Sequence, residues 1–292
     1  MKIFYFTVLL ALFCLCSCSN NGITHDLMEI NIDPLDIKSS YDIADDVEQE
    51  WDIIALETTD DCLISRIVNL IYKNDIYYLH DIAAATIFLF DKDGKYISKL
   101  AKRGPGPDEY LGIDAFTVIE KNIWISDING RRIMEYDENM QLVGQFGLSD
   151  QISPDHMINI GDYVYAGTNW SGWLNKNMQL ASYNIRDKEL NGLLYVPENK
   201  PDAPLNRKNS QLAGLDNTCL FMYSFCDTIF RIENNAVTPE YKVIFNSNYE
   251  DIPVPIQILI DPKYSKTIRG LEDIKQTANS VLLGYHFGSI SI

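Results

Sequence analysis

A glycine- and proline-rich segment, residues 103–110, gathers residue types that suit the binding of a polar ligand. Its guanidinium, carboxylate and phenol groups belong to Arg103, Asp108, Glu109 and Tyr110. Such a set of hydrogen-bond donors and acceptors could bind a sugar or a peptide. The structural alternative is that Gly104 and Gly106 supply positive φ angles while the prolines stiffen a connection between two units of the fold. We predict these four residues as candidate binding residues.

The pair Trp170 and Trp173 is a second candidate, because exposed tryptophans are frequent at binding surfaces and can stack on sugars. A Ser-Gly dipeptide separates the two residues, which indicates a loop. The alternative is that both rings pack in the core. Trp124 lies inside an apolar run, and we expect it to be a core residue.

Asp81 and Asp127 each follow an apolar run and are weak candidates for a metal site. The alternative is that each carboxylate accepts hydrogen bonds from backbone amides at the end of a strand. His80, His156 and His286 lie far apart in the chain and show no metal-binding spacing.

Other motifs for chemistry are weak or missing from the sequence. Residues 91–94, Asp-Lys-Asp-Gly, resemble the start of a calcium loop but lack its later ligands, so a hairpin turn is the prediction. Dinucleotide, phosphate-loop and nucleophile motifs are absent. We therefore predict no catalytic residue and no cofactor.

The elements that must position these residues repeat along the chain. Asp81 matches Asp127 and Asp91 matches Asp137, an offset of 46 residues. Each copy contains short segments rich in β-branched and aromatic residues, separated by Asp, Asn and Gly. The expected strands are 67–71, 76–81, 87–91 and 96–100 in the first copy, and 115–119, 123–127, 133–137 and 142–146 in the second. Four antiparallel strands per repeat of this length indicate a β-propeller blade.

Fainter copies follow around residues 162–184 and 220–245, and residues 274–292 would begin another blade. Residues 197–209 and 253–255 are expected to be breaks between strands. The fold class is therefore all-β: a propeller of four-stranded antiparallel blades, about five in this chain, with the last blade incomplete.

These segments resemble the six-bladed β-propeller family of bacterial lipoproteins, which are relatives of NHL-repeat propellers. The resemblance lies in the first strand at 54–59, the glycine-proline loop at 103–110, the strand end at 125–127, and the run formed by 227–232, 241–245 and 252–253. It implies a propeller and an anchored location, and little biochemistry. The chain departs from the pattern because it has room for about five repeats instead of six.

The N-terminus predicts export and lipid anchoring. Lys2 is followed by an apolar run from Ile3 to Leu15, the length of a signal peptide and too short to span a bilayer. Leu15-Cys16-Ser17-Cys18 resembles a lipobox, in which Cys18 is acylated; an ordinary secretory signal is the alternative. We expect a signal peptide at 1–17, a polar tether at 18–27 and the propeller at 28–292. The expected location is the outer or inner membrane of a Gram-negative bacterium, with the body in the periplasm and the cell surface as the alternative.

The charge of the chain bears on its partners, and its cysteines bear on disulfide formation. The net charge of −17 would repel nucleic acid and anionic lipid headgroups. Beyond the signal and lipobox, Cys62, Cys219 and Cys226 remain, and we expect buried free thiols; only a hairpin between Cys219 and Cys226 would permit a disulfide.

Three functions remain open at this stage. The leading hypothesis is a lipid-anchored binding or scaffold module of the cell envelope, with a glycan or protein ligand. The alternatives are a metal-dependent propeller lyase or hydrolase and a glycan-binding accessory lipoprotein. The sequence predicts no oligomeric state.

Overall fold

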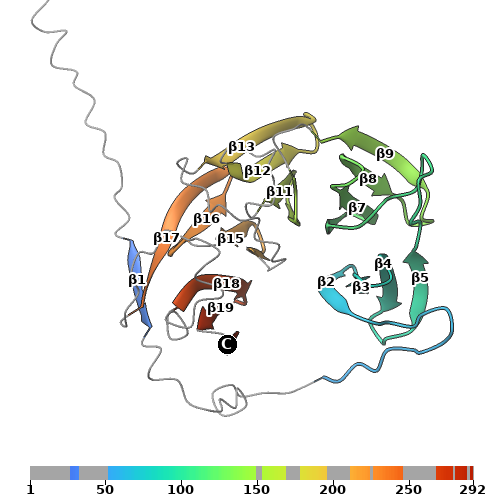
Figure 1. Ribbon diagram of the computed structural model, residues 1–292, viewed down its shortest axis with the longest axis horizontal. Coiled ribbons are helices and arrows are strands. Elements are labelled where there is room, and N and C mark those ends of the chain that lie inside the picture. Colours follow the sequence, from blue (N-terminus) through green and yellow to red (C-terminus); the bar gives the residue numbers. More distant parts are fainter. Residues whose placement is uncertain are drawn as a thin grey trace, which may run out of the picture.

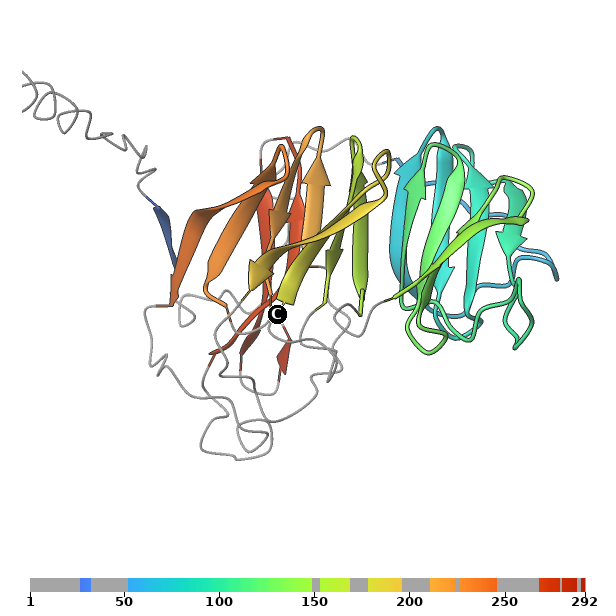
Figure 2. The ribbon, with the colours of Figure 1, turned by 90° about the horizontal axis from the view of Figure 1, so that it is seen from above.

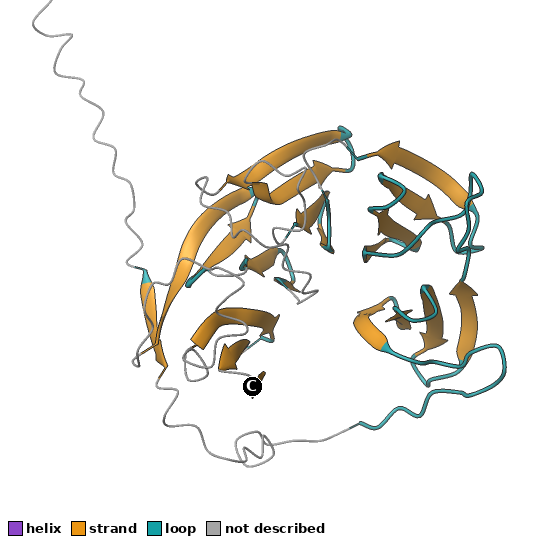
Figure 3. Cartoon of the chain, viewed as in Figure 1, coloured by secondary structure: helices purple, strands orange, loops and turns teal. Residues whose placement is uncertain are grey.

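A computed structural model describes residues 27–32, 52–148, 153–168, 178–195, 211–223, 226–245, 268–278, 280–287 and 290–291. Every regular element within these ranges is a strand, as Figure 3 shows. No helix in the described part of the chain is long and apolar enough to cross a membrane.

The two predicted repeats form two four-stranded antiparallel sheets. The first sheet contains β2 (Ile67–Lys73), β3 (Ile76–Asp81), β4 (Thr86–Asp91) and β5 (Tyr96–Leu100). The second contains β6 (Ala115–Ile119), β7 (Asn122–Asp127), β8 (Arg132–Tyr136) and β9 (Leu142–Gly147). Each strand pairs with the next one along the chain, so the strands predicted from the repeat are confirmed.

Three further sheets follow. The third contains β10 (His156–Ile160), β11 (Tyr163–Gly167), β12 (Met178–Asn184) and β13 (Glu189–Tyr195). The fourth contains β14 (Leu212–Leu215), β15 (Thr218–Phe221), β16 (Thr228–Glu233) and β17 (Ala236–Phe245), and β1 (Met28–Ile32) joins β17 in parallel. The fifth contains β18 (Ile268–Gln276), β19 (Val281–Phe287) and β20 (Ile290–Ser291).

The sheets are arranged around a common centre, which confirms the β-propeller (Figure 1). The innermost strands are the first strands of the five sheets, β2, β6, β10, β14 and β18. Neighbouring inner strands are in contact from β2 to β6 and onward to β18. Four complete blades and a three-stranded fifth sheet agree with the predicted count of about five.

All strands run between two opposite faces of the ring (Figure 2). We call one the hairpin face, which carries the tight turns at 74–75, 92–95 and 120–121. The other is the loop face, which carries the connections at 82–85, 101–114 and 128–131. The glycine-proline segment therefore lies on the loop face.

Apolar side chains fill the space between successive blades. Phe116, Ile125 and Met134 are fully buried between the first and second sheets. Separate clusters lie between the later pairs of sheets. Because both faces of a blade are covered by neighbours, nearly continuous apolar strands are stable here.

The prediction of a strand at 54–59 is wrong, because no strand forms in this segment. Leu56 instead packs beside Cys62 on the outer side of the first sheet. Glu57 attaches this segment to the first sheet by two hydrogen bonds. Its backbone N–H donates to Gly94 O at 2.8 Å, and its carboxylate accepts from Tyr96 N–H at 2.9 Å. Toward the centre, this side of the first sheet is less covered, and Leu70 is 52% exposed.

Candidate functional site

The strand-end aspartates Asp81 and Asp127 are fully buried and bind backbone amides. Asp81 accepts hydrogen bonds from the amides of residues 65, 66, 83 and 84. Asp127 accepts from Leu111 N–H at 3.1 Å and Gly130 N–H at 2.9 Å. Both carboxylates thus join the end of β3 or β7 to the segment that precedes the sheet. Asp81 already accepts two hydrogen bonds at each oxygen, so a metal ion there would have to displace some of them.

No group of three or more His, Cys, Asp or Glu side chains in the described ranges is placed to hold a metal ion. His80 is buried, with its ring edge toward Phe116 at 6.0 Å between centroids. His156 contacts Asp155, with 3.1 Å between Nδ1 and Oδ1. His286 belongs to β19, on the fifth sheet. The metal-site prediction for Asp81 and Asp127 therefore gains no support from the histidines.

Of the four candidates in segment 103–110, Tyr110 is buried, Glu109 is half-buried, and Arg103 and Asp108 are exposed. Tyr110 is fully buried, and its hydroxyl lies within 3.0 Å of Ala85 O, Leu100 O and Lys102 N–H. Burial raises the pKa of Tyr110 to about 12. A phenol with this surrounding holds the connection between β5 and β6 together and has no surface for direct contact with a ligand.

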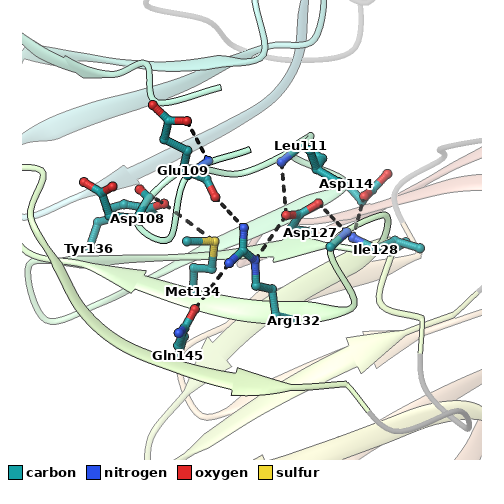
Figure 4. Close-up of polar contacts among 12 residues, drawn as sticks. Asp108, Glu109, Leu111, Asp114, Asp127, Ile128, Arg132, Met134, Tyr136 and Gln145 are labelled. Carbon is teal, nitrogen blue, oxygen red and sulfur yellow. Dashed lines mark hydrogen bonds and ion pairs between the residues drawn. The ribbon is translucent and has the colours of Figure 1, made fainter. Parts of the chain in front are cut away.

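Glu109 explains the glycines of this segment. Its carboxylate accepts from Gly106 N–H at 2.8 Å, and a Cβ at Gly104 would lie 2.0 Å from Oε2. Neither glycine has a positive φ, so the predicted role in backbone conformation is wrong and close approach of Glu109 replaces it. Arg132 donates to the backbone oxygen of Glu109 and lies beside Asp127, which ties the loop to the second sheet (Figure 4).

Arg103 and Asp108 are the members of the segment that remain accessible. Asp108 forms an ion pair with Lys102, with 3.3 Å between Oδ2 and Nζ. Its backbone oxygen accepts from the Tyr136 hydroxyl at 3.0 Å. A ligand at this segment would therefore meet Arg103 and Asp108, and their role in binding stays a prediction.

The tryptophan candidates and the lipidation site lie beyond what the structure shows. Trp170, Trp173 and Cys18 are outside the described residues, as are the expected breaks at 197–209 and 253–255. Trp124 is buried and packs against Phe146 and Tyr183. Core packing of Trp124 agrees with the expectation.

The structure also bears on the expected turns and on the thiols, of which Cys62 and Cys219 are buried and Cys226 is half-buried. Asp91 Oδ1 accepts from the amides of Asp93 and Lys95 at 2.9 Å, and Asp137 does the same with residues 139 and 141, so both positions form turns. The three cysteines in the described residues, Cys62, Cys219 and Cys226, are free.

Sequence reasoning missed the main concave feature, a central cavity of about 830 Å³ between the inner strands. All five inner strands contribute to it, and its polar lining includes Asn69, Lys73, Thr117, Asn159, Lys275 and Gln276. Toward the loop face it is lined by Asp114, Asp155 and His156. Asp114 accepts from Ile128 N–H at 2.9 Å. The signal in the sequence was a polar residue inside otherwise apolar inner strands, such as Asn69 in Ile67–Lys73 and Thr117 in Ala115–Ile119.

Lys73 is the cation best positioned within this cavity. It ends β2 at the hairpin face, and its ammonium donates to Val118 O at 2.7 Å and to Asn159 Oδ1 at 3.2 Å. Burial lowers the pKa of Lys73, and the nearby Glu120 opposes this shift. Lys73 therefore joins the inner strands of three neighbouring blades.

The fold resembles two solved structures. A protein of Bacteroides fragilis NCTC 9343, described as an exported protein, shares 15% identity and a TM-score of 0.68, over 91% of this chain and 75% of that one. A member of the DUF4221 family from Bacteroides vulgatus ATCC 8482 shares 11% identity and a TM-score of 0.51, over 76% of this chain and 70% of that one. No curated protein matches the chain. The model of the family described as a domain of unknown function, DUF4934, matches residues 29–289. The chain therefore belongs to the DUF4934 family.

Proposed function

We propose that this protein is an exported, lipid-anchored β-propeller that binds a small polar ligand in its central cavity. In this proposal residues 1–17 are a signal peptide, Cys18 carries the lipid, 18–27 are a tether and 28–292 are the propeller. The lipobox-like sequence and the resemblance to lipoprotein propellers support the anchor, although the described residues form five sheets instead of six. The similar B. fragilis protein, described as exported, supports a place outside the cytoplasm.

The size and composition of the central cavity carry the proposal. A cavity of about 830 Å³ lies within the range of about 300–1,000 Å³ that small-molecule sites occupy. Asn69 and Gln276 line it, and both amide side chains can donate and accept hydrogen bonds. This lining matches a ligand rich in hydroxyl or amide groups.

The inner strands add main-chain groups to this lining. β2, β6, β10 and β14 each pair on one side only within the sheets that the structure describes, so each presents a free edge toward the centre. A sheet edge carries unpaired N–H and C=O groups. These groups can bind a sugar or a short peptide without any special side chain.

A blocking substitution tests the proposal. The full-length protein in detergent is screened against a panel of oligosaccharides and short peptides, and each bound compound is tested again on Asn69→Trp. Asn69 is exposed and lines the cavity, so an indole there should obstruct part of the space and weaken or abolish binding. Val143→Trp is the matched control, because Val143 is 55% exposed on β9, outside the cavity. A compound that binds both variants as well as the parent would show that the cavity is not the site.

A further inference from the structure

Lys73 differs from the other lysines with described contacts in what surrounds its ammonium group. Both of its hydrogen-bond acceptors, Val118 O and Asn159 Oδ1, are uncharged. Among the described residues no carboxylate lies within ion-pair distance of Lys73. Six other lysines do have such a partner: Lys92, Lys99, Lys102, Lys121, Lys242 and Lys275. Lys73 is therefore partly buried in the cavity without a direct ion pair to any described carboxylate, and Glu120 acts on it only from beyond ion-pair distance.

The net charge of the protein is −17, yet both acceptors that contact the Lys73 ammonium are uncharged. Partly removing an ammonium from water costs free energy unless an anion balances it. An anionic ligand would supply a direct ion pair, which the described residues do not. Lys275 also lines the cavity, but Asp273 lies 3.3 Å from its Nζ and neutralises it.

The geometry of Lys73 leaves capacity for such a ligand. An ammonium group has three N–H donors, and two of them are occupied by Val118 and Asn159. These two bonds restrict the direction of the side chain, and the third donor has no acceptor among the described contacts. A positioned donor loses little conformational entropy when it binds.

We propose that Lys73 binds the carboxylate of an acidic sugar, such as a uronate residue of an oligosaccharide, in the central cavity. This inference rests on the proposed function and names its ligand class. The carboxylate pairs with the free donor of Lys73. Asn69 and Gln276 line the same cavity and can hydrogen-bond sugar hydroxyls.

The experiment compares an acid with its neutral ester. Binding of trigalacturonic acid and of its fully methyl-esterified form is measured by calorimetry on the full-length protein in detergent. The acid should bind at least about 10-fold more tightly, the usual effect of a hydrogen bond to a charged group. Lys73→Met should remove this preference, and Lys73→Arg should restore part of it.

Lys121→Met is the matched control, because it removes the same charge from an exposed turn on the hairpin face. It should keep the preference for the acid. Equal binding of acid and ester by the parent, a preference that survives Lys73→Met, or no binding of either probe would overturn the inference. The thermal unfolding midpoint of Lys73→Met is measured as well, and a midpoint close to that of the parent shows that a lost preference does not come from unfolding.

The Asn69→Trp variant separates this inference from the proposed function. If the parent binds acid and ester equally and Asn69→Trp abolishes this binding, the cavity remains the binding site. Only the role of Lys73 is then overturned. A preference for the acid that persists in Asn69→Trp would place the ligand elsewhere and overturn both.

Discussion

Replacing Asp81 with asparagine should destabilise the propeller more than its small change in shape suggests. Asp81 is fully buried, and each of its oxygens accepts two backbone hydrogen bonds. Oδ2 accepts from Ser65 and Arg66, and Oδ1 accepts from Ala83 and Ala84 at 2.9 and 3.1 Å. The carboxylate thus connects the segment before β2 to the turn after β3.

The magnitude follows from these four hydrogen bonds. Asparagine keeps one oxygen and turns an NH₂ group toward two N–H donors, so two bonds are lost. Hydrogen bonds to a charged group contribute about 1.5–3 kcal/mol each, and relief of the desolvation of the charge offsets part of this loss. We expect Asp81→Asn to lower the free energy of unfolding by about 2–4 kcal/mol at pH 7.

The pH dependence gives a second readout. Burial raises the pKa of Asp81, but the four amides outweigh it and the net pKa lies below the usual value. A carboxyl with a lower pKa in the folded state stabilises the fold above its unfolded pKa of about 3.9. This contribution is lost as the pH falls through the folded pKa. The gap between parent and Asp81→Asn should therefore narrow below about pH 4.

Urea unfolding followed by circular dichroism measures both effects. Asp93→Asn is the control, because Asp93 lies in an exposed turn beside Lys92. The unfolding midpoint of Asp93→Asn should match that of the parent. A midpoint of Asp81→Asn that equals the parent at pH 7 would refute the reasoning. An unchanged gap at low pH would show that the charge of Asp81 contributes nothing.

Three further predictions concern a turn, a thiol and the anchor. Gly94→Ala should cost about 2–4 kcal/mol in thermal or urea unfolding, because Gly94 has φ +82° and a Cβ there would lie 2.3 Å from Ala55 O. Gly147→Ala, whose Cβ would have no contact under 4.0 Å, should be nearly neutral, and equal effects would contradict this account. Burial raises the pKa of Cys219 to about 12, so its thiol should stay unlabelled by a thiol reagent at pH 8 until the protein unfolds; rapid labelling of the folded protein would contradict its burial. Cys18→Ala should lose an incorporated fatty-acid label and leave the membrane fraction, whereas retained label would show that Cys18 is not the lipid site.

The strands could be predicted because local sequence fixes them. Asp91 and Asp137 each bind the amides of the turn that follows, and Lys95 O and Gln141 O accept from the corresponding aspartate N–H at 2.9 Å. Such turns depend on a few neighbouring residues, so spacing alone reveals them. The third blade uses Asn184 in the same role, and its amide oxygen accepts from Arg186 N–H at 2.9 Å.

The rest depends on contacts between distant residues. Met28 pairs with Tyr241 in the β1–β17 ladder, and no local pattern could indicate that register. The glycine at 104 likewise has a reason that only the packed structure supplies, the carboxylate of Glu109. The central cavity is formed by strands from five separate sheets, so its lining also depends on how the blades are arranged.

The repeat itself offers a way to separate structural from functional residues. Positions that agree at an offset of 46, such as Asp81 and Asp127, hold backbone amides within each blade. Lys73 breaks the repeat, because the matching residue on β6 is Ile119, an apolar side chain packed in the core. A blade can therefore form without a cation at this position, and Lys73 lines the central cavity between the inner strands. A residue that the blade does not require, placed where a ligand can reach it, is the strongest reason to look for function at Lys73.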